Sequence, residues 1–170
     1  RELEETAADI ANILIHAGAN MQQLDAHGGN SAIHAAQAGS PLLLKAVLAA
    51  GAEADKPRTI DGATALFMAA SPFGPARSGH VECTKLLLAA GANPIGYAHD
   101  KATPLLCAVK NDSENNAEIV KLLLDRSEAK ATIDQRVDDG QNIHIPESER
   151  GTNPLVMSVE KGFPKGVELL

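Results

Sequence analysis

The stretch DGATALFMAASPFGPARSGHVECTKLLLAAGANP, residues 61–94, decides the fold. Thr64 is a hydroxyl N-cap, and Leu66, Ala69 and Ala70 then fall on one face of a short helix. A second helix is predicted over 81–90, and Gly91 supplies the left-handed residue that ends it. Helices this short are marginal alone in water. The unit must therefore stack on copies of itself.

Copies of the unit recur along the chain. Gly-Ala pairs begin at Gly18, Gly51 and Gly91, the first two lying 33 residues apart. Four segments open like a capped first helix, at 31–34, 64–67, 103–106 and 153–156, with Ser, Thr, Thr and Asn as the predicted caps. In the last two, proline follows at the first helical position, where its missing N–H has no cost.

These motifs resemble the ankyrin repeat family, whose pattern runs Gly-x-Thr-Pro-Leu-His-x-Ala-Ala, Gly-His, Val-x-x-Leu-Leu and Gly-Ala. The resemblance covers nearly the whole chain and implies an all-α solenoid of stacked helix-turn-helix units. We expect one domain over 1–170. It would hold a partial repeat at 1–20, repeats at about 25–52, 61–94 and 98–127, an insertion at 127–150 and a truncated repeat at 151–170.

Two smaller expectations concern the first half of the chain. Thr6 to Asp9 has the form of a capping box, after which Ile10, Ile13, Leu14 and Ala17 form a predicted inward stripe. His34 matches the histidine of the family pattern. The resemblance implies a structural role for it, with hydrogen bonds inside the turn and against the neighbouring repeat.

The insertion is the main departure from the pattern, because Ser127 stands where the family has glycine. Asp138-Asp139-Gly140 fits a three-residue hairpin loop, which predicts a β-hairpin finger from Ile133 to Ile145. Disorder is the alternative, given the charge of the segment.

Composition excludes several classes of protein. A 44% hydrophobic share rules out a disordered chain, and 2% aromatic residues suit thin layers of Ala and Leu. The net charge of −7 gives no support to nucleic-acid binding. No segment is apolar enough for membrane insertion. Cys83 and Cys107 lack a C-x-x-C context, so we expect buried thiols in the cytoplasm, with the nucleus as the alternative.

The sequence contains none of the catalytic or metal-ligand spacings sought, so we expect no enzyme activity and no cofactor. We expect a scaffold that binds a partner protein through its concave face and turn tips; the alternative is a regulatory or targeting module of a larger enzyme, channel or effector. The chain starts without Met, and we expect it to be part of a longer one. The residues predicted to contact the partner are His27, Arg58, Tyr97, His99 and Lys101 at the tips, and Asp134, Asp138 and Asp139 for a basic segment of the partner.

Overall fold

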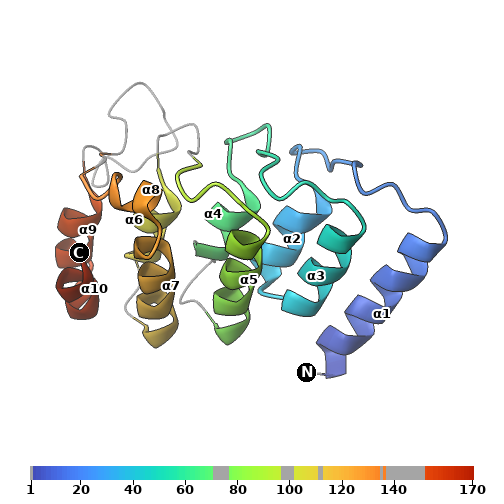
Figure 1. Cartoon of the computed structure of the whole chain (residues 1–170), viewed down its shortest axis with the longest axis horizontal. Helices are drawn as coiled ribbons and strands as arrows, with labels where there is room; N and C mark the ends of the chain where they lie inside the picture. The colour runs from blue at the N-terminus through green and yellow to red at the C-terminus, as the bar shows by residue number, and fades with distance from the viewer. Residues whose placement is uncertain (1, 71–76, 97–101, 111–112, 135, 137–151) are drawn as a thin grey trace.

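The computed structural model describes residues 2–70, 77–96, 102–110, 113–134, 136 and 152–170. The helices stand side by side in one row. The loops that join successive repeats lie at the same end of the helices, along the top of the view in Figure 1. Along the chain they are α1 (Glu2–His16), α2 (Ser31–Ala38), α3 (Pro41–Ala49), α4 (Ala65–Ala70), α5 (Ser78–Ala89), α6 (Pro104–Ala108), α7 (Glu114–Leu124), α8 (Ser127–Lys130), α9 (Pro154–Glu160) and α10 (Pro164–Leu169).

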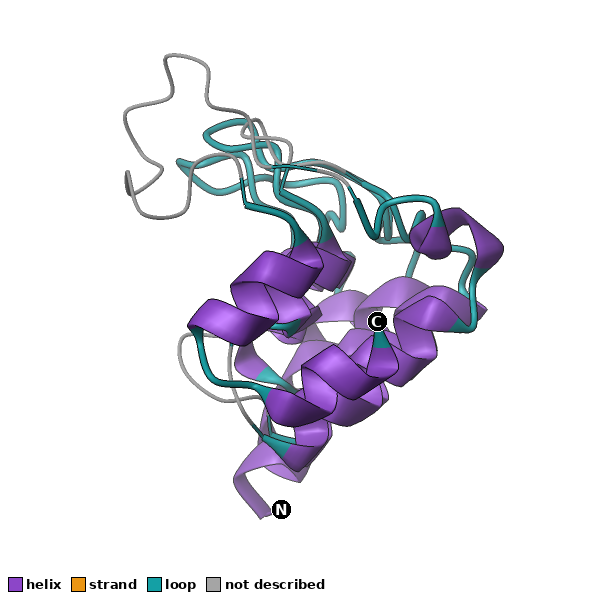
Figure 2. Cartoon of the chain, turned by 90° about the vertical axis from the view of Figure 1, so that its left-hand side faces the viewer, coloured by secondary structure: helices purple, strands orange, loops and turns teal. Residues whose placement is uncertain are grey.

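The row has two layers. The first helices α2, α4, α6 and α9 pack on one another, and the second helices α1, α3, α5, α7 and α10 form the other layer. Each first helix also packs on the second helix of its own repeat. Seen along the row, the loops project away from both layers to one side (Figure 2). This arrangement is the predicted all-α solenoid.

Small side chains fill the space between the layers. Alanine and leucine dominate the buried residues, and Ala35, Leu66, Ala69, Leu87 and Leu105 are fully inaccessible to solvent. Because most of these side chains are short, neighbouring helices approach closely. Phe163, near the C-terminal end, is the largest side chain that is fully buried in this core. Cys83 and Cys107 are buried in the same core, as expected.

Three of the four predicted caps are confirmed. The side chains of Thr64, Thr103 and Asn153 accept from the amides of Phe67, Leu106 and Val156 at 3.3, 3.1 and 2.9 Å. The fourth prediction is wrong by one residue, because Asn30, and not Ser31, caps α2. The Asn30 carboxamide accepts from the amide of Ile33 at 3.0 Å and donates to the carbonyl of Glu53 at 2.8 Å, a second bond that Ser31 does not make.

The N-terminal expectations also need correction. The helix does not begin at Thr6, since α1 runs from Glu2. Ile10, Ile13 and Leu14 do not point into the core; each is more than half exposed, while Ala8 is buried. The reason is that α1 packs extensively only on α3 among the described helices.

The glycine stops behave as predicted, since Gly18, Gly51 and Gly91 all have φ between 83° and 93°. Where glycine is missing, α7 ends at Leu124 and Ser127 begins the short helix α8.

Of the predicted β-hairpin finger, Ile133 and Asp134 lie in a turn, and most of the rest lies outside the described residues. The described residues contain no strand. None of their helices is long and apolar enough to cross a bilayer.

Candidate partner-binding site

The turn before α2 is held together by one carboxylate. Asp25 Oδ1 accepts from the amides of His27 at 2.7 Å and Gly29 at 2.8 Å, and Oδ2 lies 2.6 Å from His34 Nε2. These hydrogen bonds, the one from Gly29 foremost, lower the pKa of Asp25 to about 2 although desolvation opposes them. The turn is therefore closed at neutral pH and presents His27 to solvent.

His34 has the structural role inside the turn that the resemblance implied, while its predicted hydrogen bond to the neighbouring repeat stays a prediction. Its bond to Asp25 closes the loop from the side of α2. The cap at Asn30 places Ile33, and not His34, three residues after the cap. His34 is consequently one position further along the helix than the family pattern puts its histidine, and its side chain is 55% exposed.

The turn before α4 uses an ion pair. The guanidinium of Arg58 binds the carboxylate of Asp61, with Nε 3.0 Å from Oδ1, and the same Oδ1 accepts from the amide of Ala63 at 3.1 Å. The hydrogen bond to Asp61 raises the pKa of Arg58. Only 20% of the Arg58 side chain is exposed. Arg58 therefore holds the turn in shape, and its contact with a partner stays a prediction.

The two turns are joined to each other at their tips. The carbonyl oxygen of His27 accepts from the hydroxyl of Thr59 at 2.9 Å and from the amide of Ile60 at 3.2 Å. Gly28 lies so close to the second turn that a Cβ there would be 2.2 Å from Thr59 Oγ1. The pairing fixes Ile60 beside His27 with 59% of its surface exposed.

Sequence reasoning missed Ile60. Its signal is an apolar residue inside the polar turn Arg58-Thr59-Ile60-Asp61-Gly62, where nothing local can cover it. A large exposed aliphatic side chain on a fixed loop is a candidate anchor for a partner.

Further hydrogen bonds link the loops of the first three repeats. Gln22 donates from Nε2 to the carbonyl of Gly51 at 3.0 Å. The carboxylate of Asp55 accepts from the amide of Asn93 at 2.9 and 3.1 Å. Because the loops of these three repeats are bound to one another, their spacing along the row is fixed.

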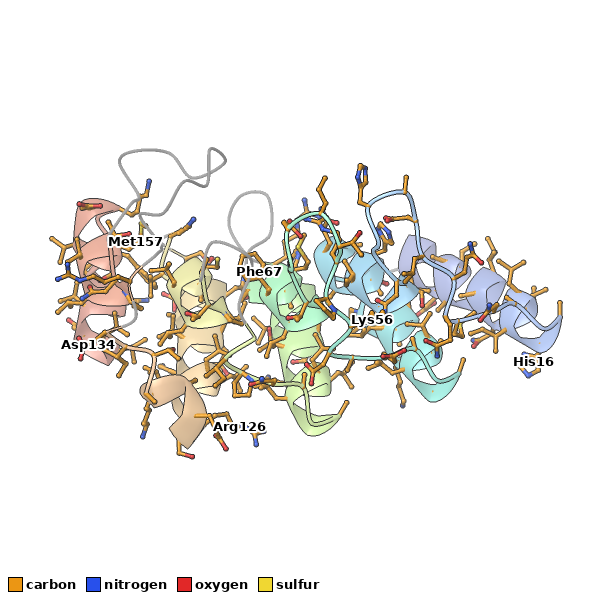
Figure 3. All side chains as sticks on the ribbon, turned by 90° about the horizontal axis from the view of Figure 1, so that it is seen from above. His16, Lys56, Phe67, Arg126, Asp134 and Met157 are labelled. Carbon is orange, nitrogen blue, oxygen red and sulfur yellow. The ribbon has the colours of Figure 1, made fainter. Side chains whose placement is uncertain are left out.

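The other predicted contact residues are placed as follows. Tyr97, His99 and Lys101 lie outside the described residues, as do Asp138 and Asp139. Asp134 is exposed in the turn after α8, and Figure 3 places it near the α9–α10 end of the row. The structure thus brings the turns of His27 and Arg58 together and keeps Asp134 apart from them.

The described residues of the turn tips present a mixed apolar and polar surface. Within the part of the chain that the structure describes, no group of three or more His, Cys, Asp or Glu side chains could hold a metal ion. The tips offer an exposed isoleucine, an imidazole and carboxylates already engaged in the turns. Such a surface suits an apolar and polar contact with another polypeptide.

Three findings relate the chain to known proteins. The family model described as ankyrin repeats (3 copies) matches residues 3–94, 32–136 and 76–170. The mouse (Mus musculus) B-cell lymphoma 3 protein homolog is 34% identical over 170 residues, which cover 96% of this chain and 35% of the mouse protein. The chain thus spans about a third of that relative's length. The crystal structure of an ankyrin repeat domain from Acinetobacter baumannii superposes with a TM-score of 0.74 at 28% identity, covering 96% of this chain and 75% of that one.

The family model reaches from residue 3 to residue 170, and the stacked two-layer row has the architecture of the solved relative. Repeats of this kind are generally protein-interaction modules and are typically non-catalytic. The chain belongs to the ankyrin repeat family.

Proposed function

We propose that this chain is a non-catalytic binding module that holds a partner protein against its turn tips and the adjoining concave face. The observation that carries the proposal is the pairing of the His27 and Thr59-Ile60 tips, which keeps a 59% exposed isoleucine fixed. These side chains are outside the stacking core, so they can be of any type that suits a partner without loss of packing in the core. A pre-ordered tip also loses little conformational freedom on binding.

Ile60 is the proposed apolar anchor and His27 the neighbouring polar contact. Asp25 and Arg58 support the two turns beneath them. Tyr97, His99 and Lys101 remain proposed contacts.

A quantitative capture experiment tests the proposal. The intact chain, a tip variant carrying His27→Ala with Ile60→Ser, and a control variant Lys45→Ala would each be used as bait in native lysate. Lys45 is exposed on α3, in the layer of second helices, which makes it a matched surface change. We expect one set of proteins to be retained by the intact chain and the control and to be lost from the tip variant. Equal retention by all three baits would rule out the tips as the binding surface.

A second proposal concerns the acidic residues Asp134, Asp138 and Asp139, which would attract a basic segment of the partner. Asp134 is exposed, as this role requires. Electrostatic attraction between exposed charges weakens as salt screens it. A captured complex whose affinity does not change between about 0.1 and 0.5 M salt would exclude this contribution.

The chain matches only about a third of its mouse relative, which favours considering a targeting or regulatory module of a larger protein as the alternative. In that case the same tips would bind either a separate partner or another part of the larger protein. Sequencing of the complete reading frame shows whether the chain is part of a larger protein. Capture with the tip variant shows whether the tips bind a separate partner.

A further inference from the structure

A cleft of about 260 Å³ lies between the turn that follows α5 and the segment that joins α7 to α8. Its lining consists of the end of α5, the turn and two charged residues, namely Leu88, Gly91, Ala92, Asn93, Pro94, Arg126 and Glu128. Leu88 and Ala92 are buried, whereas the two charged residues are exposed. Figure 3 shows Arg126 beside α8, at the edge of the row. The cleft thus has an apolar floor and a charged rim.

The cleft is open because this pair of turns is not joined as the preceding turns are. Gln22 and Asp55 each stand four residues after the glycine that ends their helix, and each binds the backbone of the next turn. Ile95 holds the same position after Gly91, and an isoleucine side chain cannot make a hydrogen bond. Among the described residues, no hydrogen bond joins this turn to the segment that follows α7. The space between them is therefore available to a ligand.

Two hydrogen-bond donors at the cleft are unused within the described part of the chain. The guanidinium of Arg126 makes neither a hydrogen bond nor an ion pair there. Asn93 gives its backbone amide to Asp55 and accepts from the amide of Ile95 at 3.0 Å with Oδ1, which leaves Nδ2 free. A guanidinium and a carboxamide N–H are both suited to a carboxylate. The two walls of the cleft thus each offer a donor to one.

Glu128 narrows the choice of ligand. Its Oε2 accepts from the hydroxyl of Ser127 at 3.2 Å, and Oε1 has no partner among the residues that the structure describes. A simple anion such as phosphate would be repelled by Glu128, and a simple cation would be repelled by Arg126. A molecule with a carboxylate and an ammonium group on neighbouring atoms can pair with both residues. An α-amino acid has this arrangement.

The size and the floor of the cleft favour a small aliphatic ligand. Pockets for drug-sized molecules are roughly 300–1,000 Å³, so this cleft suits a smaller one. Leu88 and Ala92, together with Pro94, offer apolar surface to an aliphatic side chain.

We propose that the cleft binds a free α-amino acid with a small aliphatic side chain. The carboxylate of the ligand pairs with Arg126 and Asn93, and its ammonium group pairs with Glu128. The side chain of the ligand lies against Leu88 and Ala92. This site is separate from the turn tips, so the proposal does not depend on them.

Titration of L-leucine into the isotope-labelled intact chain tests the site directly. We expect saturable NMR shifts of the amides of Leu88, Ala92 and Glu128, with a dissociation constant on the order of a millimolar because the charged groups are exposed. N-acetyl-L-leucine lacks the ammonium group and L-leucinamide lacks the carboxylate. Each should therefore bind about fivefold more weakly than L-leucine.

Substitutions at the rim of the cleft test the two charged residues. Arg126→Gln should weaken the binding of L-leucine about fivefold. Glu128→Gln should remove the preference for L-leucine over its N-acetyl derivative. Lys130→Gln, an exposed change on α8 outside the cleft, is the control and should bind like the unchanged chain. Thermal melting checks that all three variants fold.

Three outcomes would overturn the proposal. The first is the absence of saturable shifts at about 20 mM L-leucine. The second is an unchanged affinity for L-leucine in Arg126→Gln. The third is equal binding of L-leucine and N-acetyl-L-leucine by the unchanged chain, which would assign the cleft to the C-terminal carboxylate of a polypeptide instead.

Discussion

The imidazole of His80 in α5 joins two repeats by donating from Nε2 to the carbonyl oxygen of Gln37 in α2, 3.2 Å away. The other ring nitrogen, Nδ1, accepts from the amide of Arg77 at 3.1 Å. An imidazole that accepts at Nδ1 must carry its proton on Nε2, so these contacts require the neutral ring. His80 is 3% exposed, and burial lowers its pKa, with the nearby positive charge of Arg77 acting in the same direction.

This histidine should make stability depend on pH. Because its pKa is lower in the folded than in the unfolded chain, the unfolded state binds more protons below about pH 6.5, and the free energy of unfolding falls there as pH decreases. Its contribution is fully present above that pH. Urea titrations between pH 8 and pH 5 measure the effect.

The control for this prediction comes from the chain itself. Asn116 stands in α7 where His80 stands in α5, and its side chain donates to the carbonyl of Ala108 at 2.9 Å. His80→Asn keeps a donor and an acceptor but does not titrate, so its stability should decrease less than that of the unchanged chain as pH is lowered. If both proteins lose the same free energy of unfolding, His80 is not the group responsible.

A close backbone contact between the same repeats gives a second prediction. A Cβ at Gly79 would lie 2.0 Å from the carbonyl oxygen of Gly39. Helix propensity alone predicts that Gly79→Ala stabilises α5 by up to about 1 kcal/mol. The clash is with backbone that cannot move aside, so we expect a loss of roughly 3 kcal/mol instead. Thermal and urea unfolding decide the sign, and a stabilised variant would contradict the packing seen here.

The two adjacent candidate caps of α2 provide a third prediction. Asn30→Ala removes both the bond to the amide of Ile33 and the bond to Glu53, so it should cost about 1–2 kcal/mol. Ser31 Oγ is buried with no hydrogen-bond partner. Ser31→Ala should therefore be neutral within about 0.5 kcal/mol or slightly stabilising. A larger loss in Ser31→Ala than in Asn30→Ala would assign the cap to Ser31 after all.

Asp25 gives a fourth prediction, for acid conditions. Its pKa is lowered to about 2 from an ordinary 3.8, so its contribution to stability is present above pH 3.8 and is lost as pH falls toward 2. Asp25→Asn should flatten the acid limb of the stability curve between these values and lower the melting temperature at pH 7. Carbonyl-detected NMR titration of the Asp25 side chain checks the pKa directly, and a midpoint near 4 would be inconsistent with the turn described here.

Sequence patterns predicted the repeat architecture well because stacking repeats the same local signals. Thr64, Thr103 and Asn153 cap their helices, and Gly18, Gly51 and Gly91 end theirs, since both roles depend on neighbouring residues alone. The cap at Asn30 was missed because the bond that distinguishes it from Ser31 reaches Glu53, 23 residues away.

The candidate site was harder to predict for the same reason. The tip of Ile60 is fixed by the carbonyl of His27 in another repeat, a contact that no local pattern encodes. Arg58 was predicted only as a contact at a turn tip, and the sequence did not reveal that its ion pair with Asp61 supports the turn. Ile10, Ile13 and Leu14 in α1 have the period of a core face, and only the arrangement of neighbouring helices shows that they are exposed.

The last prediction compares two leucines at one repeat position. Leu87 is fully buried between α5 and its neighbours, so Leu87→Ala should remove about 2–5 kcal/mol of unfolding free energy. Leu14 is 55% exposed, and Leu14→Ala should cost less than about 1 kcal/mol because little apolar surface is returned to water and no cavity forms. Urea titrations of the two variants at one pH measure both values. Similar losses would mean that Leu14 is covered in solution, by self-association or by another contact of α1, and would contradict the exposure described here.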